Sequence, residues 1–164
     1  MKFEPLDSQK HHRRDFDCGV KALNLYLKNF AGQDQKRSLS RVYVLSNDSK
    51  IIGYYSISAH SVSRDYLPDD VKVGNYHDIP FLLLGRLAVD RQYQGQGFGG
   101  ALIYHAFTTT IEAADRIGIL GIIVDAKDER AIKFYEGFGF KPLQASPNRL
   151  VLPLPLIRKL VHSN

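Results

Sequence analysis

A glycine-rich stretch at residues 92–100 is the part of the chain whose residue types and spacing indicate chemistry. It reads Gln-Tyr-Gln-Gly-Gln-Gly-Phe-Gly-Gly and lies between an apolar run and a segment with helical periodicity. Glycine has no Cβ, so the backbone there can turn tightly and come close to a ligand. The unpaired N–H groups at a helix start, together with the helix dipole, favour phosphate oxygens. The stretch therefore predicts a site for an anionic, phosphate-bearing ligand.

Other interpretations of the same glycines differ in what they require of the rest of the chain. Gly95-x-Gly97-x-x-Gly100 matches a dinucleotide-binding fingerprint. Only 64 residues follow Gly100, too few for the remaining strand–helix units of a Rossmann domain. A Walker loop is excluded because no Gly-Lys-Ser/Thr follows. Glycines that merely allow a helix to pack closely on a strand remain an alternative to ligand binding.

The elements before this stretch can be placed from periodicity and turn residues. Apolar residues at helical spacing predict a helix over 17–31, with Asp17 as its N-cap. Residues 41–46 and 51–59 predict two strands of an antiparallel hairpin, because a polar turn cluster separates them. Prolines and mixed charge predict an irregular loop over 60–80.

The second half of the chain alternates strands and helices. Continuous apolar runs predict buried strands, and amphipathic spacing predicts helices. The expected order is strand 81–89, helix 102–114, strand 119–126, helix 129–137, a short strand after 138–140 and a last strand at 149–154. Together with the hairpin, this order predicts an α/β (α+β) fold, a mixed sheet flanked by helices, in a single domain over residues 1–164.

Composition is that of an ordinary globular protein, with 44% hydrophobic and 24% charged residues. No apolar stretch approaches the roughly 20 residues that cross a bilayer, so no membrane contact is expected. The first residues lack the apolar core of a signal peptide, and Cys18 is the single cysteine, so a cytoplasmic protein is expected. Cys18 is interpreted as a buried thiol rather than a nucleophile. No Cys/His spacing resembles a zinc site, so no metal is expected.

The net charge of +5 is unevenly distributed. Residues 1–41 hold nine Lys/Arg and five Asp/Glu, and residues 141–164 hold four Lys/Arg and no acid. Basic flanks of this kind favour a polyanionic partner such as nucleic acid or a phosphate-rich cofactor. Solvated surface charge without a partner is the alternative.

Three motifs resemble those of the GNAT acyltransferase family. The family pattern Gln/Arg-x-x-Gly-x-Gly/Ala occurs twice, starting at Gln92 and at Gln94, and Leu102 favours the second start. Gly-Arg-Leu-Ala-Val-Asp at 85–90 is similar to the preceding strand of the family. Residues 128–140 resemble its Asn-x-x-Ala-x-x-x-Tyr-x-x-x-Gly-Phe, with Asp128 in place of Asn. The chain is therefore identified as a member of this family.

The resemblance implies a division of labour around acetyl-CoA as co-substrate. The fourth and fifth strands of such a sheet splay apart, so that backbone groups of the fourth can pair with the pantetheine arm. The glycine-loop amides would take the pyrophosphate, and a backbone N–H near Leu87 to Val89 would stabilise the oxyanion. The implied cofactor contacts are Leu87, Ala88, Val89, Gln94, Gly95, Gln96, Gly97, Gly99, Gly100 and Asp128.

The resemblance also implies that Tyr135 is the general acid that protonates the leaving thiolate. Tyr135 could instead be an aromatic core residue, since Phe134 precedes it. The base is not evident, because residues 81–89 contain no acid. Asp90 is interpreted as a turn or cap residue and His105 as a surface or core histidine. An amine that is already partly neutral, such as that of an aminoacyl ester, would need no dedicated base.

Outside these motifs, the chain resembles the acetyltransferase toxins of bacterial type II toxin–antitoxin pairs. The likeness includes Phe16-x-Cys18-Gly19 and the segments 41–44 and 53–56. It implies that the acceptor is the α-amine of aminoacyl-tRNA. It further implies a homodimer, silencing by a ribbon–helix–helix antitoxin, and binding of operator DNA only through the antitoxin complex.

Basic side chains are the expected contacts to tRNA. Arg86 would lie near the mouth of the active site and contact the terminal phosphate or ribose of the acceptor, or form an ion pair with Asp90 or Asp125. The backbone contacts would be Lys10, Arg13, Arg14, Lys36, Arg37 and Arg41. A small-molecule or protein amine as acceptor, and a cofactor-binding module without catalysis, remain as alternatives.

Overall fold

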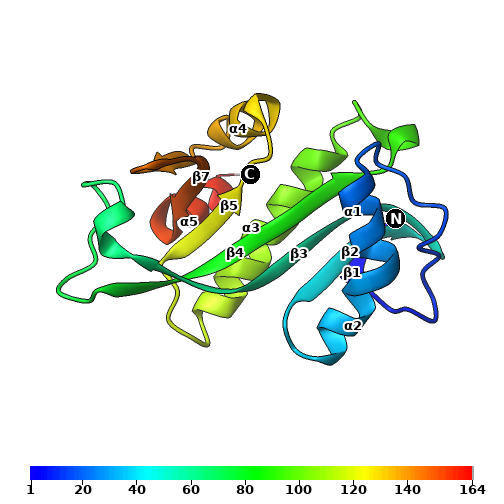
Figure 1. The fold of residues 1–164 in the computed structure, drawn as a ribbon, viewed down its shortest axis with the longest axis horizontal. Coiled ribbons are helices and arrows are strands. Elements are labelled where there is room, and N and C mark those ends of the chain that lie inside the picture. Colours follow the sequence, from blue (N-terminus) through cyan, green and yellow to red (C-terminus); the bar gives the residue numbers. More distant parts are fainter. Residues whose placement is uncertain (164) are drawn as a thin grey trace. The chain divides into compact units, whose positions relative to one another are not determined.

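The computed structural model describes residues 1–163. The chain forms two compact units, each built from two separate stretches. Unit 1 comprises Met1–Ser58 and Gly85–Ala106, and unit 2 comprises Ala59–Leu84 and the described residues from Phe107 onward. Seven strands are hydrogen-bonded in the order β1-β2-β3-β4-β5-β7-β6 (Figure 1). The expected mixed α/β fold is confirmed, while the assignment of the whole chain to one domain stays a prediction.

Unit 1 contains the N-terminal strand, the first helices and the predicted hairpin. Its elements are β1 (Lys2–Pro5), α1 (Lys21–Leu25), a π-helical turn (Tyr26–Phe30), α2 (Ala31–Lys36), β2 (Arg41–Asn47) and the first part of β3 (Lys50–Ser63). The antiparallel hairpin is confirmed. The predicted N-cap is wrong, because the first helix begins at Lys21 and the Asp17 carboxylate instead accepts from the Gly19 N–H and the Asn24 side chain.

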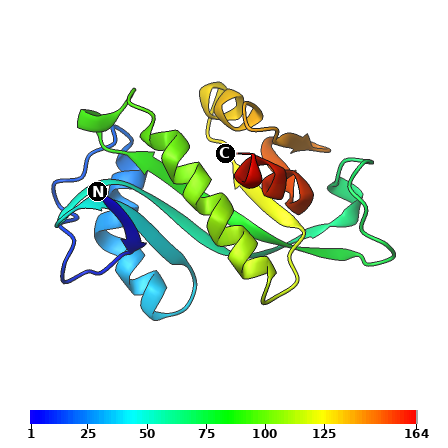
Figure 2. The same ribbon diagram turned by 180° about the vertical axis from the view of Figure 1, so that it is seen from behind.

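Two neighbouring residues of β3 show which helices cover its faces in unit 1. The Tyr54 hydroxyl donates to the carbonyl of Leu23, 2.7 Å away in α1. A Cβ on the adjacent Gly53 would lie 2.8 Å from Cδ1 of Leu102 in α3 (Phe98–Ala114). Successive side chains of a strand point to opposite faces. Helix α1 and the first half of α3 therefore cover opposite faces, as the two views show (Figures 1 and 2).

Unit 2 contains the end of β3 and the start of β4 (Asp78–Val89), so residues 60–80 are less irregular than expected. Its other elements are β5 (Gly121–Asp125), α4 (Glu129–Glu136), β6 (Lys141–Leu143), β7 (Ser146–Pro153) and α5 (Leu154–His162). The parallel pairing of β4 with β5 involves Leu82–Leu84 alone. Helices α4 and α5 pack against β7, and α5 also packs against β5. No helix within residues 1–163 has the length and apolar character needed to cross a membrane.

Candidate active site

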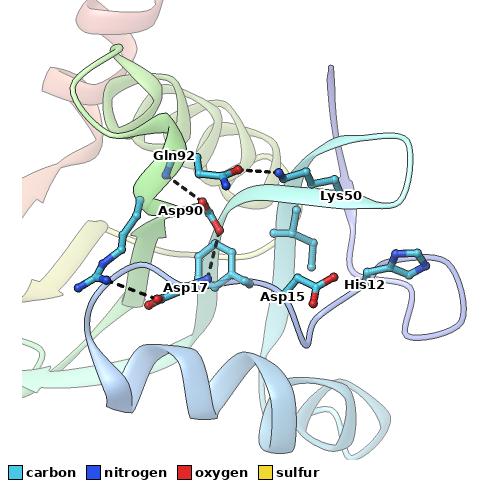
Figure 3. Close-up of a pocket in the computed structure, with 9 residues that line it drawn as sticks. His12, Asp15, Asp17, Lys50, Asp90 and Gln92 are labelled. Atoms are coloured by element: carbon cyan, nitrogen blue, oxygen red, sulfur yellow. Dashed lines mark hydrogen bonds and ion pairs between the residues drawn. The ribbon is translucent and has the colours of Figure 1, made fainter.

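The glycine loop is held in place by a buried carboxylate. Asp90, at the end of β4, accepts from the N–H of Gln92 at 3.0 Å and from that of Asp17 at 3.1 Å. Figure 3 shows these bonds beside the bond from Lys50 to Gln92. The backbone N–H of Arg91 donates in turn to the carbonyl of Asp17 at 2.8 Å. The prediction of Asp90 as a cap is confirmed, since it caps a short 3₁₀ turn over Arg91–Tyr93.

The two glutamines expected to contact the cofactor use their side chains to fix the loop backbone. Gln94 Nε2 donates to the carbonyls of Cys18 and Val89, each at 2.9 Å. Gln96 Nε2 donates to the carbonyl of Gln92 at 3.2 Å. A cofactor contact from either residue would therefore use its backbone rather than these side-chain nitrogens.

The glycine loop presents unpaired backbone donors at the start of α3. Gly95 and Gly97 have φ values of 75° and 87°, in the left-handed region that favours glycine. Apart from the adjacent residues and the backbone of α3 itself, no atom lies within 4 Å of a Cβ built at Gly95, Gly97 or Gly100, so the loop faces open space. Within residues 1–163, no N–H from 95 to 100 donates to a backbone oxygen, and Ala101 is the first to do so. Such a row of donors at the N-terminus of a long helix fits a pyrophosphate.

The strand residues expected to contact the cofactor precede this loop in unit 1. Ala88 is buried, and Leu87 and Val89 are half-buried. The N–H of Asp90 donates to the carbonyl of Ile52 at 2.8 Å, so β3 lies along one edge of this segment. The pairing with β5 ends at Leu84 on the other edge. The backbone of Leu87–Val89 thus lies beyond the parallel ladder, as an extended ligand arm would require.

Arg86 contacts an aromatic ring rather than a carboxylate. Its guanidinium carbon lies 3.5 Å from the centroid of the Tyr26 ring, and Nη1 donates to Ser56 Oγ at 3.4 Å. Neither expected ion pair forms, because both Asp90 oxygens accept from backbone N–H groups and Asp125 pairs with Arg149. Among residues 1–163, Arg86 has no carboxylate within ion-pair distance.

Tyr135 lies in unit 2, on α4, where its ring packs against Phe140 at a centroid distance of 5.5 Å. The residue is 7% exposed, and this burial raises the pKa of Tyr135 to about 12. Its hydroxyl has no hydrogen-bond partner in residues 1–163, yet no buried side-chain oxygen there is left unsatisfied. The hydroxyl therefore retains access to solvent while the ring is enclosed, which suits a proton donor. Asp128 caps the same helix by accepting from the Ala131 N–H at 2.8 Å.

The structure brings Arg86, the Leu87–Val89 strand and the glycine loop together in unit 1, and Asp128 and Tyr135 together in unit 2. His105 is not a free base, since its Nδ1 is hydrogen-bonded to the Tyr55 hydroxyl and its ring stacks on Phe3. Cys18 is a buried thiol, as expected. No cluster of three or more metal-ligating side chains occurs in the described chain.

A polar cluster that sequence reasoning missed lies on β3, β5 and β7 of unit 2. Arg149 binds Asp125 through two hydrogen bonds of 2.6 and 2.9 Å. Its Nη1 lies 2.9 Å from Nε2 of His60. A guanidinium nitrogen can only donate, so Nε2 of His60 accepts. Burial, followed by the positive charge of Arg149, lowers the pKa of His60. Only the strand register, which sets Asp125 opposite Arg149, could have revealed the pair.

The basic residues expected at a nucleic-acid surface all lie in unit 1. Arg13 is half-buried and donates to the carbonyl of Lys28 at 3.3 Å. Lys10 is instead paired with Glu4 at 2.7 Å. Four further cations are exposed and, within the described residues, form no ion pair: Arg14, Lys36, Arg37 and Arg41.

The sequence matches a known family and curated proteins. The model of the acetyltransferase (GNAT) domain matches residues 38–142. A "Probable toxin TacT" of Sinorhizobium fredii is 32% identical over 96% of this chain and 93% of its own length. A "tRNA-acetylating toxin" of Mycobacterium tuberculosis is 34% identical over 89% of this chain and 88% of its own length.

Solved structures match over nearly the whole chain. AtaT complexed with acetyl-methionyl-tRNAfMet has a TM-score of 0.89 and 34% identity, covering 97% of this chain and 98% of that one. A tyrosine-to-phenylalanine mutant of AtaT, bound to the C-terminus of the antitoxin AtaR and acetyl-CoA, has a TM-score of 0.84 and 32% identity, covering 97% and 96%. The KacTA–DNA complex has a TM-score of 0.85 and 32% identity, covering 99% of each.

Proposed function

The chain belongs to the GNAT acetyltransferase family, and from this premise we propose that it transfers acetyl from acetyl-CoA to the α-amine of aminoacyl-tRNA. It would thereby block translation as the toxin of a toxin–antitoxin pair. The observation that carries the proposal is the row of unpaired N–H donors at Gly95–Gly100, in the unit that also carries the unpaired cations. The first suits a pyrophosphate and the second suits the phosphates of an RNA.

Each part of the chemistry has a residue to perform it. Acetyl-CoA supplies an activated acyl group, which the N–H groups of Gly95–Gly100 and the backbone of Leu87–Val89 would hold. A backbone N–H of Leu87–Val89 would stabilise the charge that develops on the acetyl oxygen. Tyr135 would donate its proton to the departing sulfur, since its raised pKa keeps the phenol protonated until a base forms beside it.

No carboxylate is needed as a base with this acceptor. The ester bond of an aminoacyl-tRNA withdraws electrons from its α-amine, so part of the amine is neutral near pH 7. The part of β4 in unit 1 has no acidic side chain before Asp90, and both Asp90 oxygens already accept hydrogen bonds. An acceptor that brings its own neutral amine is consistent with that arrangement.

The proposal extends to partners and place of action. The named relatives form complexes with tRNA, with the antitoxin AtaR and, for KacTA, with DNA. The protein described here would act in the cytoplasm as a homodimer. A ribbon–helix–helix antitoxin would neutralise it and carry it to operator DNA. Light scattering of the purified protein, alone and with the neighbouring gene product, tests these assemblies.

Incorporation of label from radioactive acetyl-CoA tests the proposed reaction. Total charged tRNA is the acceptor, and the same tRNA after deacylation is the control. Label should enter the charged pool alone and leave with the amino acid on mild alkaline hydrolysis. Equal labelling of both pools, or labelling of small amines but not of charged tRNA, would contradict the proposal.

A further inference from the structure

A cleft in unit 1 lies beside the strand segment proposed to hold the acetyl group. It has a volume of about 490 Å³. Its walls are mainly apolar and include the side chains of Ala22, Leu25, Tyr26, Phe30 and Arg86. Leu25 is 39% exposed and Phe30 is 53% exposed, so two large apolar side chains face solvent in one place. Apolar residues gathered in this way are uncommon unless they bind something.

The backbone that carries the cleft is irregular. Tyr26 and Phe30 are the first and last residues of the π-helical turn that separates α1 from α2. Such turns are rare and occur frequently at functional sites. The Tyr26 hydroxyl donates to Asp34 at 3.0 Å and is also hydrogen-bonded to Ser40. These bonds fix the Tyr26 ring and leave Phe30 as an exposed wall.

Arg86 connects this cleft to the reacting groups. It lies on β4 directly before Leu87, so the two Cα atoms are about 3.8 Å apart. The Tyr26 ring and Ser56 hold the guanidinium in place, while no carboxylate of the described chain neutralises it. A fixed guanidinium with free N–H donors suits a phosphate or an ester carbonyl at the edge of an apolar cavity.

We propose that this cleft receives the amino-acid side chain of the aminoacyl-tRNA and selects large apolar side chains, with Arg86 binding the adjoining ester or terminal phosphate. The inference rests on the proposed function and adds a specificity determinant to it. Apolar walls stabilise a buried methylene or ring and leave a polar side chain without partners. The carboxylate of Asp34 also lines the cleft and would repel an acidic side chain once the Arg86 guanidinium is bound to the ester or phosphate.

One tRNA body charged with different amino acids tests the selection, because the RNA contacts then stay constant. The acceptors are the methionyl, leucyl, phenylalanyl, glycyl and aspartyl esters of that tRNA, made with an acylating ribozyme. The expected kcat/KM is about 10- to 100-fold higher for the three apolar esters than for the glycyl and aspartyl esters. Equal values across the series would overturn the inference and leave the proposed function intact. If no ester is acetylated while acetyl-CoA still binds, the proposed function fails, and the inference fails with it.

Two substitutions locate the selection in the cleft. Phe30→Ala removes a wall and should lower the apolar-to-glycyl ratio of kcat/KM about 10-fold. Ala22→Phe fills the cleft from an exposed helix position and should lower the ratio by reducing turnover of the large esters. Ile117→Ala, an exposed apolar residue of unit 2, is the control and should leave the ratio unchanged. A wild-type ratio in a folded Phe30→Ala or Ala22→Phe protein, checked by circular dichroism, would contradict the assignment.

Discussion

The guanidinium of Arg86 lies 3.5 Å from the centroid of the Tyr26 ring, although the two residues are on different elements and far apart in sequence. A planar guanidinium makes this contact better than an ammonium does, and such contacts contribute about 1–2 kcal/mol when partly desolvated. Arg86→Lys keeps the charge and weakens the contact. We expect kcat/KM for aminoacyl-tRNA to fall about 5- to 30-fold, with unchanged affinity for acetyl-CoA. Steady-state kinetics and calorimetry measure the two effects, and a loss confined to acetyl-CoA affinity would contradict the expectation.

A second prediction concerns the glycine loop. Gly97 has a φ of 87°, so Gly97→Ala should strain the backbone by about 1–2 kcal/mol and shift the N–H donors at the start of α3. Affinity for acetyl-CoA should fall at least 10-fold by calorimetry. Gly74→Ala is the matched control, because Gly74 also has a positive φ of 64° and open space around it, but lies in unit 2. Both variants should lose stability, and only the loop variant should lose affinity. Equal affinities would remove the loop from the binding site.

The role of Tyr135 can be separated from its packing. Tyr135→Phe retains the ring against Phe140 and removes the proton. Turnover should fall about 10²- to 10⁴-fold, whereas the Kd for acetyl-CoA and the Tm should change little. A variant as active as the wild type would show that Tyr135 only fills the core.

The pH dependence supplies an independent check on Tyr135. A general acid works in its protonated form, and burial raises the pKa of Tyr135 to about 12. The acid is therefore intact from pH 7 to 10 and is lost only as the pH approaches 12. The titration of Tyr135 should therefore cause no decline of kcat between pH 7 and 10. A decline in that range that is present in the wild type and absent in Tyr135→Phe is not expected. Finding such a decline would place the titration of Tyr135 well below 12.

The salt dependence of tRNA acetylation should report the exposed cations of unit 1. Each phosphate contact contributes a slope of about 0.7–0.9 in a plot of log affinity against log salt. Replacing Arg37 and Arg41 by Ala should therefore reduce the slope by about 1.4–1.8. The control replaces two exposed lysines of unit 2, Lys72 and Lys159. An identical slope in both double variants would show that the cations of unit 1 do not contact the tRNA.

A stability prediction concerns Glu4 on β1. Lys10 and then His11 bind its carboxylate, and these bonds lower the pKa of Glu4 from 4.5 to about 2. Because the pKa of the folded state is below that of the unfolded state, this stabilisation is complete above pH 4.5. It is lost as the pH falls toward 2. Glu4→Gln should lower Tm at pH 7, and the difference from the wild type should shrink between pH 4.5 and 2. A difference in Tm that stays constant over that range would refute the assignment.

The sequence predicts elements whose residues carry a local signal. The hairpin of β2 and β3 follows from two apolar strands and a polar turn between them. The left-handed φ values of Gly95 and Gly97 follow from the tight turn of the glycine loop. Strand β1 has no such signal, because its residues Lys2–Pro5 form a strand only by pairing with β2. The predicted first helix begins too early, because the Asp17 carboxylate accepts from the Gly19 N–H and the Asn24 side chain instead of capping the helix. An aspartate placed before a helical pattern fits either use, so the sequence does not distinguish them.

The residues of the candidate site likewise divide into those whose role follows from the local sequence and those whose role depends on tertiary packing. Asp90 is a capping residue as expected, and Asp128 also caps a helix, because a cap depends on the next few residues along the chain. The contact of Arg86 with Tyr26 and the pair of Arg149 with Asp125 depend on tertiary packing and strand register. The sequence therefore shows which residues carry charge, but not which charges are already neutralised.

The bonds between the glycine loop and the segment before α1 have a thermodynamic consequence. The Asp17 N–H donates to the Asp90 carboxylate, the Arg91 N–H donates to the carbonyl of Asp17, and Gln94 Nε2 donates to the carbonyl of Cys18. Opening of this segment would release the loop, so the two should exchange their amide hydrogens as one cooperative unit. A ligand that binds only the closed loop must slow that exchange in proportion to its occupancy. The amides of Asp17 and Arg91 thus become reporters of cofactor binding, although no cofactor atom needs to touch them.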